Sequence, residues 1–326
     1  MESQICCLAA MLSSFDEVGR LLEENGIHIG INTVRNIVQQ FAFRARAAKK
    51  IDSIDFPDNL NGRRVVVSTD GGRIRIRKNK RGPKTPKGRK RYRTDWREPK
   101  LLIIYGVDEK GRSDRLFSPV IEATLKGPDA VFGLISYYLK QLQIERADQV
   151  IFIADGARWI WTRFKEWVTR LNLAGRIYQL VDFYHAVEHL GKVAELKKAW
   201  QPCERKRWIK KHRRLLLKGH IDRVIAEIKR ICRGRISKKL ARERTYFVRN
   251  KKRMNYKEVC ELKLPIGSGA VESAIRRVIN LRLKGASIYW LEEMAEAMLM
   301  LRSYYKAGRW NTLKLFAFSV SLGIEK

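Results

Sequence analysis

Two aspartates and one glutamate stand at positions where carboxylates can bind metal ions together. Asp70 directly follows the mainly apolar run 65–69, and Asp155 directly follows the apolar run 150–154. Glu272 comes just after a Gly-Ser-Gly turn, at the start of a basic segment. Mg²⁺ prefers oxygen ligands, and pairs of such ions held by carboxylates catalyse phosphoryl transfer. We therefore predict that these three acids bind Mg²⁺ or Mn²⁺, with two ions at the site.

The chain carries a large excess of positive charge. Its 326 residues include 68 Lys and Arg against 34 Asp and Glu, a formal net charge of +34. Residues 73–100 contain 14 basic residues, and residues 191–263 contain 26 basic and seven acidic residues. Such an excess predicts a nucleic-acid partner bound through its phosphates. The side chains that we expect to bind DNA are Arg73, Arg75, Arg77, Lys78, Lys80, Arg81, Arg158, Arg276, Arg277, Arg282 and Lys284.

The composition argues against several other classes of protein. A chain that is 45% hydrophobic and 31% charged is expected to fold rather than to stay disordered. No run of about 18 or more apolar residues could cross a bilayer, and no N-terminal segment is typical of a signal peptide. The five cysteines form no Cys-x-x-Cys pair, which argues against a disulfide framework or a zinc finger. We expect a cytoplasmic protein without a membrane partner.

Residues 1–60 are predicted to form a helical region. The spacing of apolar residues predicts one helix over 15–25 and a second that is capped by Asn32-Thr33 and ends at Phe43. Two short helices around a glycine-containing turn form either a helix-turn-helix that reads DNA or a hairpin that only packs. The sequence leaves both open. Residues 52–62 are predicted to form a linker.

The middle of the chain alternates between predicted strands and helices. The predicted strands cover residues 63–69, 73–77, 101–107, 149–154 and 176–181, and the predicted helices cover 128–142 and 158–173. Residues 78–100, rich in Gly, Pro and basic side chains, are predicted to form an exposed arm. We expect the first three strands to form a meander, which predicts an α/β fold with a mixed sheet flanked by helices.

The segment that carries Glu272 has the pattern of an amphipathic helix. Its apolar side chains recur at helical spacing and are expected to face the sheet: Val271, Ala274, Ile275, Val278 and Ile279. Glu272 lies at the border of this stripe, where its side chain can lean into a cleft. Arg276 lies one turn further on and could contact the phosphate that the metal contacts.

A second group of polar residues begins at Asp182. The run His185-x-x-Glu188-His189 matches an inverted zinc-protease motif, for which Glu258 or Glu261 would be the third acidic ligand. A peptidase explains neither the net charge nor the positions of the two strand-end aspartates, so this interpretation is disfavoured. The alternative is a structural histidine that pairs with Asp182 or with a backbone carbonyl.

Together, several short stretches resemble a known family. The chain resembles bacterial insertion-sequence transposases of the DDE type, which have an RNase H-like catalytic domain, and is similar to the ISKra-type group. The resemblance rests on the residue stretches 68–73, 96–100, 154–159, 182–185, 266–273 and 282–285. They occur in the family's order and span most of the chain.

The resemblance implies a function and a domain plan. Asp70, Asp155 and Glu272 would be the metal-binding triad, and Asp182 and His185 a supporting element for strand cleavage. The enzyme would cut DNA at the ends of the element and join them to target DNA, as a homo-oligomer assembled on DNA near the bacterial nucleoid. The implied parts are a helical region (1–60), the first part of the RNase H-like core (61–190), a basic all-helical insertion (191–263) and the return of the core (264–326).

Two rival interpretations of the chain remain open at this point. One is a nuclease of the same fold that cuts DNA without joining it, and the other is a non-catalytic DNA-binding relative of a transposase. The role of Trp159 and Trp161 is also undecided by the sequence, since these side chains either stack on an unpaired base or pack in the core.

Overall fold

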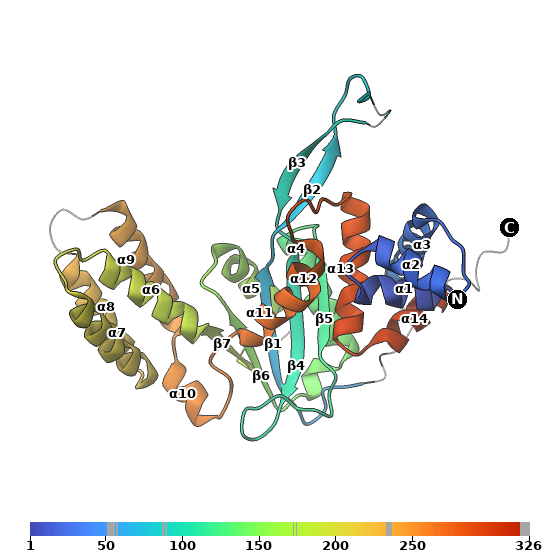
Figure 1. Ribbon diagram of the computed structural model, residues 1–326. Coiled ribbons are helices and arrows are strands. Elements are labelled where there is room, and N and C mark those ends of the chain that lie inside the picture. Colours follow the sequence, from blue (N-terminus) through green and yellow to red (C-terminus); the bar gives the residue numbers. More distant parts are fainter. Residues whose placement is uncertain are drawn as a thin grey trace.

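The computed structural model describes residues 1–50, 56, 58–86, 88, 90–171, 173, 175–232 and 237–319, and of Lys50 only the backbone. Figure 1 shows a central sheet with a helical lobe on its left and the first and last helices of the chain packed together on its right. A two-stranded arm projects from the top of the sheet. Much of the predicted linker, residues 52–55 and 57, lies outside the described residues.

The central sheet contains five strands in the order β5-β4-β1-β6-β7. The strands are β1 (Arg64–Gly71), β4 (Lys100–Val107), β5 (Val120–Thr124), β6 (Gln149–Ala154) and β7 (Ile177–Val181). β1 pairs antiparallel with β4 and β4 antiparallel with β5, whereas β6 runs parallel to both β1 and β7. The predicted α/β fold with a mixed sheet flanked by helices is confirmed.

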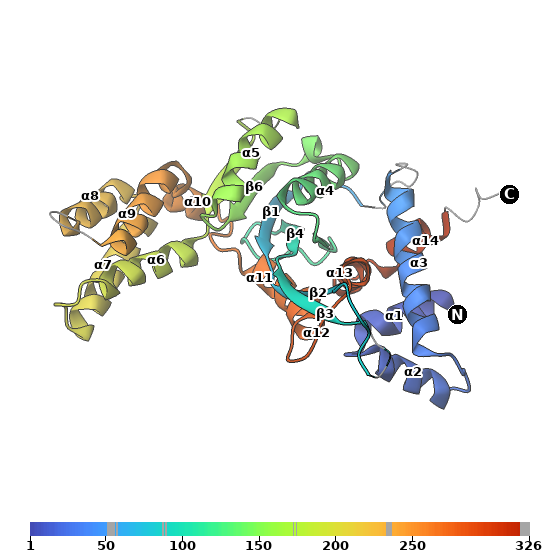
Figure 2. The same cartoon turned by 90° about the horizontal axis from the view of Figure 1, so that it is seen from above.

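Helices cover both faces of this sheet (Figure 2). One face packs against α4 (Pro128–Gln141) and α5 (Arg158–Arg170), and the other against α11 (Gly269–Ile275) and α13 (Glu292–Lys306). Between the latter two, the chain forms a π-helical turn at Arg276–Asn280 and the short α12 (Leu281–Leu283). The apolar stripe predicted for the Glu272 helix is buried at all five positions, which confirms that this side of the helix faces the core.

The predicted meander was wrong in its choice of strands. β2 (Ile74–Asn79) does not join the sheet but pairs with β3 (Tyr92–Arg97) in a separate two-stranded ribbon, the arm of Figure 1. The third strand of the meander is β5, which the sequence analysis did not predict. The polar side chains of β2 and β3 explain the difference, because a ribbon of mostly solvent-exposed residues needs no apolar face.

In the part of residues 1–63 that the structure describes, three helices precede the sheet, not the two predicted. They are α1 (Glu2–Met11), α2 (Phe15–Glu24) and α3 (Ile31–Lys50). α3 begins before the predicted cap and continues past Phe43, because its second half packs against α13 and α14 (Trp310–Ser319). Val38, Phe41 and Ala45 of α3 are completely buried there.

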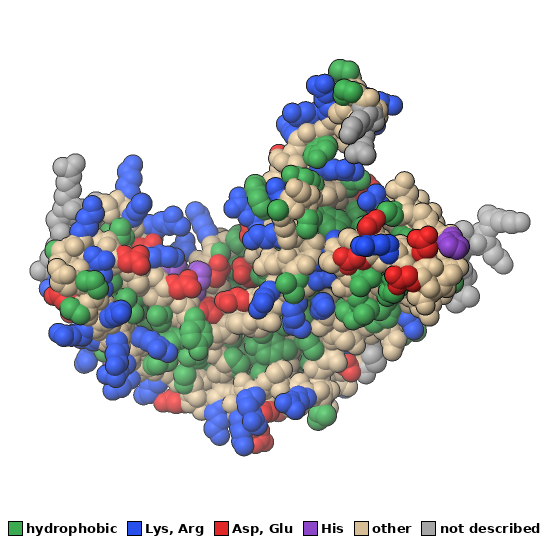
Figure 3. Space-filling view, in the orientation of Figure 1, with side chains coloured by type: hydrophobic (Ala, Val, Ile, Leu, Met, Phe, Trp, Pro, Cys, Tyr) green, Lys and Arg blue, Asp and Glu red, His purple; other side chains and the backbone are tan. Residues whose placement is uncertain are grey.

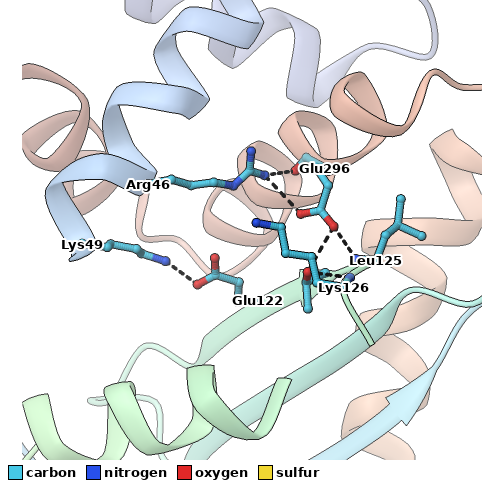
Figure 4. Close-up of polar contacts among 7 residues, drawn as sticks. Arg46, Lys49, Glu122, Leu125, Lys126 and Glu296 are labelled. Carbon is cyan, nitrogen blue, oxygen red and sulfur yellow. Dashed lines mark hydrogen bonds and ion pairs between the residues drawn. The ribbon is translucent and has the colours of Figure 1, made fainter. Parts of the chain in front are cut away.

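Ion pairs join α3 to the edge of the sheet (Figure 4). Lys49 Nζ forms a buried ion pair with Glu122 of β5 and lies 2.6 Å from the Tyr138 hydroxyl. Arg46 pairs at 3.5 Å with Glu296 of α13, and Glu296 also accepts hydrogen bonds from Thr124 Oγ1 (3.0 Å) and from the Leu125 amide. These contacts satisfy buried charges that would otherwise destabilise the fold.

The lobe on the left of Figure 1 is helical throughout its described part. It contains α6 (Phe183–Glu195), α7 (Pro202–Leu217), α8 (Ile221–Ile231), α9 (Lys238–Asn250) and α10 (Tyr256–Glu261). α6 begins directly after β7 and crosses the predicted domain boundary at residue 190, so one continuous helix links the sheet to the lobe. None of the helices in the described ranges has the length and apolar character needed to span a membrane.

Candidate metal centre and nucleic-acid surface

Asp70 and Asp155 lie at the same end of two neighbouring strands. β1 and β6 are parallel, with Ser68 opposite Ile153, so Asp70 and Asp155 occupy equivalent positions two residues further along. Asp155 Oδ1 accepts a hydrogen bond from the Ala157 amide (2.9 Å), which fixes the turn into α5. The carboxyl ends of parallel strands are where open α/β sheets place ligands.

The buried carboxylate of Asp70 is electrostatically unfavourable in its ionised form. Burial, with smaller contributions from the nearby charges of Asp155 and Glu98, raises the pKa of Asp70 to about 6. The Gly71 amide, which donates to Asp70 Oδ1 at 2.7 Å, and His185 act in the opposite direction. A divalent cation beside Asp70 would relieve this repulsion, because it stabilises the ionised carboxylates.

Asp70→Asn is expected to stabilise the metal-free protein at neutral pH. The folded-state pKa of about 6 lies above the ordinary value of 3.8, so the folded protein holds this proton more tightly and loses stability as the pH rises through that interval. The amide keeps the shape of the side chain and removes the penalty, which is on the order of 1–3 kcal/mol. Urea unfolding in EDTA at pH 5 and pH 7.5 measures this gain, which should be larger at pH 7.5. A variant less stable than the wild type at pH 7.5 would contradict the assignment.

Asp182 connects the end of β7 to the turn before Glu272. Its side chain is 2% exposed and caps α6 by accepting a hydrogen bond from the His185 amide (2.7 Å). It also accepts hydrogen bonds from Ser268 Oγ (2.6 Å) and from the Ser268 amide. The Phe183 amide donates to Ile266 O at 2.9 Å, and the Asp182 amide donates to Ala154 O at 2.8 Å. Asp182 therefore positions the turn that begins α11 next to the end of β6.

Glu272 lies in the first turn of α11, the helix whose beginning these contacts hold next to the end of β6. α11 packs against β1 and β4, and a Cβ at Gly72 would lie 2.6 Å from Ile279 Cδ1 of the same helical segment. The side chain of Glu272 is exposed. In the described part of the chain, no three Asp, Glu, His or Cys side chains already form a group that could hold a metal ion. The joint binding of metal by all three acids therefore stays a prediction.

The π-helical turn that follows α11 has a specific partner. Arg302 of α13 is 2% exposed, and its guanidinium donates to Val278 O (2.8 Å), to Arg277 O and to Ala10 O (2.6 Å). A π-turn disturbs the regular hydrogen bonds of a helix, and the guanidinium satisfies carbonyls at this point. Arg302 thus fixes the course of the segment after Glu272, which the sequence pattern alone did not reveal.

The histidines of α6 are not arranged as the zinc-protease motif requires. His189 Nδ1 pairs with Glu243 of α9, and its ring stacks on Tyr246 with 3.6 Å between ring centroids. His185 Nδ1 lies 3.5 Å from Glu188, whose side chain is 63% exposed. The acidic residue of the lobe that pairs with His189 is thus Glu243, and not Glu258 or Glu261. The alternative structural pairing was also wrong in detail, since Asp182 accepts from the backbone amide of His185 and not from its ring.

The residue after Asp155 is in close contact with the helical lobe. A Cβ at Gly156 would lie 2.2 Å from Tyr246 Cε2 and 3.0 Å from Asn250 Nδ2. Arg249 also donates to Gly156 O at 2.7 Å, and the charge of Asp155 is near enough to raise the pKa of the buried Tyr246 hydroxyl, after the larger effect of burial. The lobe therefore supports the loop that carries Asp155.

Gly156→Ala is expected to destabilise the protein by about 1–3 kcal/mol, the usual cost of overpacking a buried site. Tyr246 cannot retreat easily, because its ring is stacked on His189. Urea unfolding measures the change. Gly191→Ala in α6 is the matched control, since nothing lies within 4 Å of the added methyl group there. If the two variants were equally stable, the contact between residue 156 and Tyr246 would have room for a methyl group, which would contradict this prediction.

Two charged residues near the acids, Glu98 and Lys100, were not predicted to belong to the site. A Cβ at Gly71 would lie 2.0 Å from Glu98 Oε1, so the Glu98 carboxyl covers the chain next to Asp70. Lys100 Nζ lies 2.6 Å from Glu98 Oε1 and 4.1 Å from the centre of the Trp159 ring. Trp161 is 7% exposed and donates to Asp155 O at 2.7 Å, so it packs in the core, and Trp159 is partly buried against the core.

The predicted DNA-binding side chains are mainly at the surface. Figure 3 shows Lys and Arg gathered on the arm and on the lobe, with a hollowed surface between them. The exposed members of the predicted set are Arg73, Arg77, Lys78, Lys80, Arg81, Arg158, Arg276 and Lys284, and Arg75 and Arg277 are half-buried. On the arm, Arg73 and Arg75 lie over the Trp96 ring, at 4.6 and 5.5 Å from its centre. Arg282 differs from the others because it is buried.

Comparisons with known protein families, with curated proteins and with solved structures found no match to this chain.

Proposed function

We propose that this chain is a metal-dependent DNA transposase with an RNase H-like catalytic core. The observation that carries the proposal is the placement of Asp70 and Asp155 at equivalent ends of two neighbouring parallel strands, with the helix of Glu272 tied to the same edge through Asp182. The strand order, an antiparallel meander followed by two parallel strands, supports an RNase H-like core. Assembly of several copies on DNA stays a prediction.

The acids at this edge suit Mg²⁺ or Mn²⁺. Their oxygens are the ligands that these ions prefer, and the buried charge of Asp70 is unfavourable without a cation. When bound there, two ions would activate a water or a 3′-hydroxyl and stabilise the leaving oxygen. Glu272, one turn after Ser268, would complete the ligand set by leaning toward the two aspartates.

The remaining residues would bind and orient DNA around this edge. The arm and the lobe present Lys and Arg on the two sides of the hollowed surface in Figure 3, where phosphates of one DNA molecule can contact both. His185 is close enough to Asp70 to lower its pKa. In its protonated form it would donate a hydrogen bond to a phosphate oxygen held at the acids.

A transposition assay tests the proposal directly. A donor plasmid carries the DNA that flanks this chain's gene on both sides, and a second plasmid serves as the target. We expect Mg²⁺ to yield joined products that EDTA abolishes. Cleavage without joining would favour a nuclease of the same fold, and DNA binding without any metal-dependent cleavage would favour a non-catalytic relative.

A further inference from the structure

A hollow lies where the N-terminal helices meet the base of the arm. Its volume is about 490 Å³, and its walls include Phe15, Arg35, Arg77, Arg282, Tyr289 and Trp290. Trp290 fixes the wall to the arm, because its amide donates to Arg75 O (3.0 Å) and its carbonyl accepts from the Arg77 amide (2.9 Å). The hollow therefore joins three parts of the chain: α2 and α3, the ribbon, and the segment around α12.

The buried wall of this hollow contains an arginine whose N–H groups are incompletely hydrogen-bonded among the described residues. Arg282 is 5% exposed, and in the described part of the protein its buried Nε and Nη2 atoms have no hydrogen-bond partner. Its guanidinium lies against a pair of aromatic rings that contact each other, 5.4 Å from the centre of Phe15 and 5.1 Å from that of Trp290. Burial lowers the pKa of Arg282 to about 10, and the charge of Glu17 opposes this shift.

The positive charge around the hollow is poorly compensated. Burial, and to a smaller extent the charge of Arg282, lowers the pKa of Arg302 to about 10. Among the described residues, the Arg302 guanidinium donates hydrogen bonds only to backbone carbonyls. Asp16 is the acidic residue of the described wall, and it pairs with Arg20 at 3.7 Å on the exposed surface of α2. Glu17 is near enough to act on Arg282, but its carboxylate accepts hydrogen bonds from Ser13, and no ion pair joins it to Arg282 among the described residues. A buried guanidinium without a directly paired carboxylate is unfavourable, and a bound anion would reduce that penalty.

We propose that this hollow binds a phosphate group of a nucleic-acid strand, an inference that rests on the DNA binding proposed above. Arginines bind phosphate through several N–H groups, and the aromatic wall suits the sugar and base attached to that phosphate. The arm supplies a path, because Arg77 on β2 reaches the hollow only seven residues after Asp70. A strand held at the acids can therefore follow the ribbon to this second contact.

Arg282→Met tests the proposal, with Arg20→Met as the matched control. Arg20 carries the same charge on the same side of the molecule but is exposed on α2 and does not line the hollow. Without an anion, Arg282→Met should unfold at a urea concentration no lower than the wild type, because an unpaired buried charge is removed. Inorganic phosphate, added at constant ionic strength, should raise the unfolding temperature of the wild type and of Arg20→Met but not that of Arg282→Met.

A 20-nucleotide oligonucleotide tests the nucleic-acid part. Loss of one phosphate contact should weaken binding of Arg282→Met roughly tenfold and reduce the slope of log K against log salt by about one, whereas Arg20→Met should behave as the wild type. If Arg282→Met fails to fold, Arg77→Met, on the exposed wall of the hollow, takes its place. It should also bind the oligonucleotide more weakly and with a smaller salt slope. Unchanged binding by Arg77→Met would overturn the proposal.

The other outcomes also decide between alternatives. A phosphate response that depends on Arg282, with unchanged oligonucleotide binding, would assign the hollow to a small phosphate-bearing molecule and overturn the nucleic-acid assignment. Equal responses of Arg282→Met and the wild type to both ligands would overturn the site itself. A wild type that binds no oligonucleotide would refute the proposed function rather than the hollow alone.

Discussion

Asp155→Asn is expected to lower the rate of metal-dependent DNA cleavage by at least about 10²–10³-fold, the loss seen when one charge-stabilising group is removed from an active site. The amide removes one negative ligand but keeps an Oδ1 that can accept from the Ala157 amide, so the turn into α5 should stay intact. The fold should therefore be preserved while the affinity for Mn²⁺ falls.

A plasmid-nicking assay with Mg²⁺ and a titration with Mn²⁺ measure the two effects on the same protein. Asp148→Asn is the matched control, because Asp148 is exposed and precedes β6 at its other end. Cleavage by Asp155→Asn at the rate of this control would show that Asp155 does not hold the catalytic metal.

Asp182→Ala is expected to cost about 2–5 kcal/mol of folding stability. The buried carboxylate accepts from the amides of His185 and Ser268, and its loss leaves these two donors without their partner. Because the same carboxylate holds the turn before α11, cleavage should also fall sharply through displacement of Glu272. Urea unfolding and the nicking assay measure the two consequences.

Ser268→Ala separates the contributions of this contact. It removes only the hydrogen bond of the Ser268 hydroxyl (2.6 Å) and should cost about 1–2 kcal/mol, with most cleavage retained. If both variants were equally stable, Asp182 would be a side chain of local importance and not the link between β7 and α11.

The strands that were predicted well are those that the local sequence shows as apolar runs. β1, β4 and β6 are mainly apolar runs that are buried on both faces of the sheet, and β7 is an apolar edge strand that is partly exposed. The bounds of all four lie close to the predicted ones. β5 was missed because it is short and contains Glu122, a buried charge that is satisfied by Lys49, 73 residues away, and by the Tyr138 hydroxyl. β3 was missed because its exposed polar residues carry no apolar alternation.

The candidate site could be predicted in part for the same reason. The positions of Asp70 and Asp155 follow from where two buried strands end, and the structure places them side by side. The contacts of Asp182 with Ser268, of Gly156 with Tyr246 and of Arg302 with Val278 join segments between 24 and 90 residues apart. Such pairings depend on how the helices pack, and no local pattern encodes them.

The most direct measurement is the anomalous diffraction of crystals grown with Mn²⁺ and a DNA oligonucleotide at pH 7.5. We expect Mn²⁺ peaks about 2.0–2.3 Å from carboxyl oxygens of Asp70 and Asp155, with Glu272 turned inward as a further ligand. Peaks elsewhere on the molecule, with Glu272 still directed into solvent and no cation between the two aspartates, would contradict metal-dependent catalysis at this edge of the sheet.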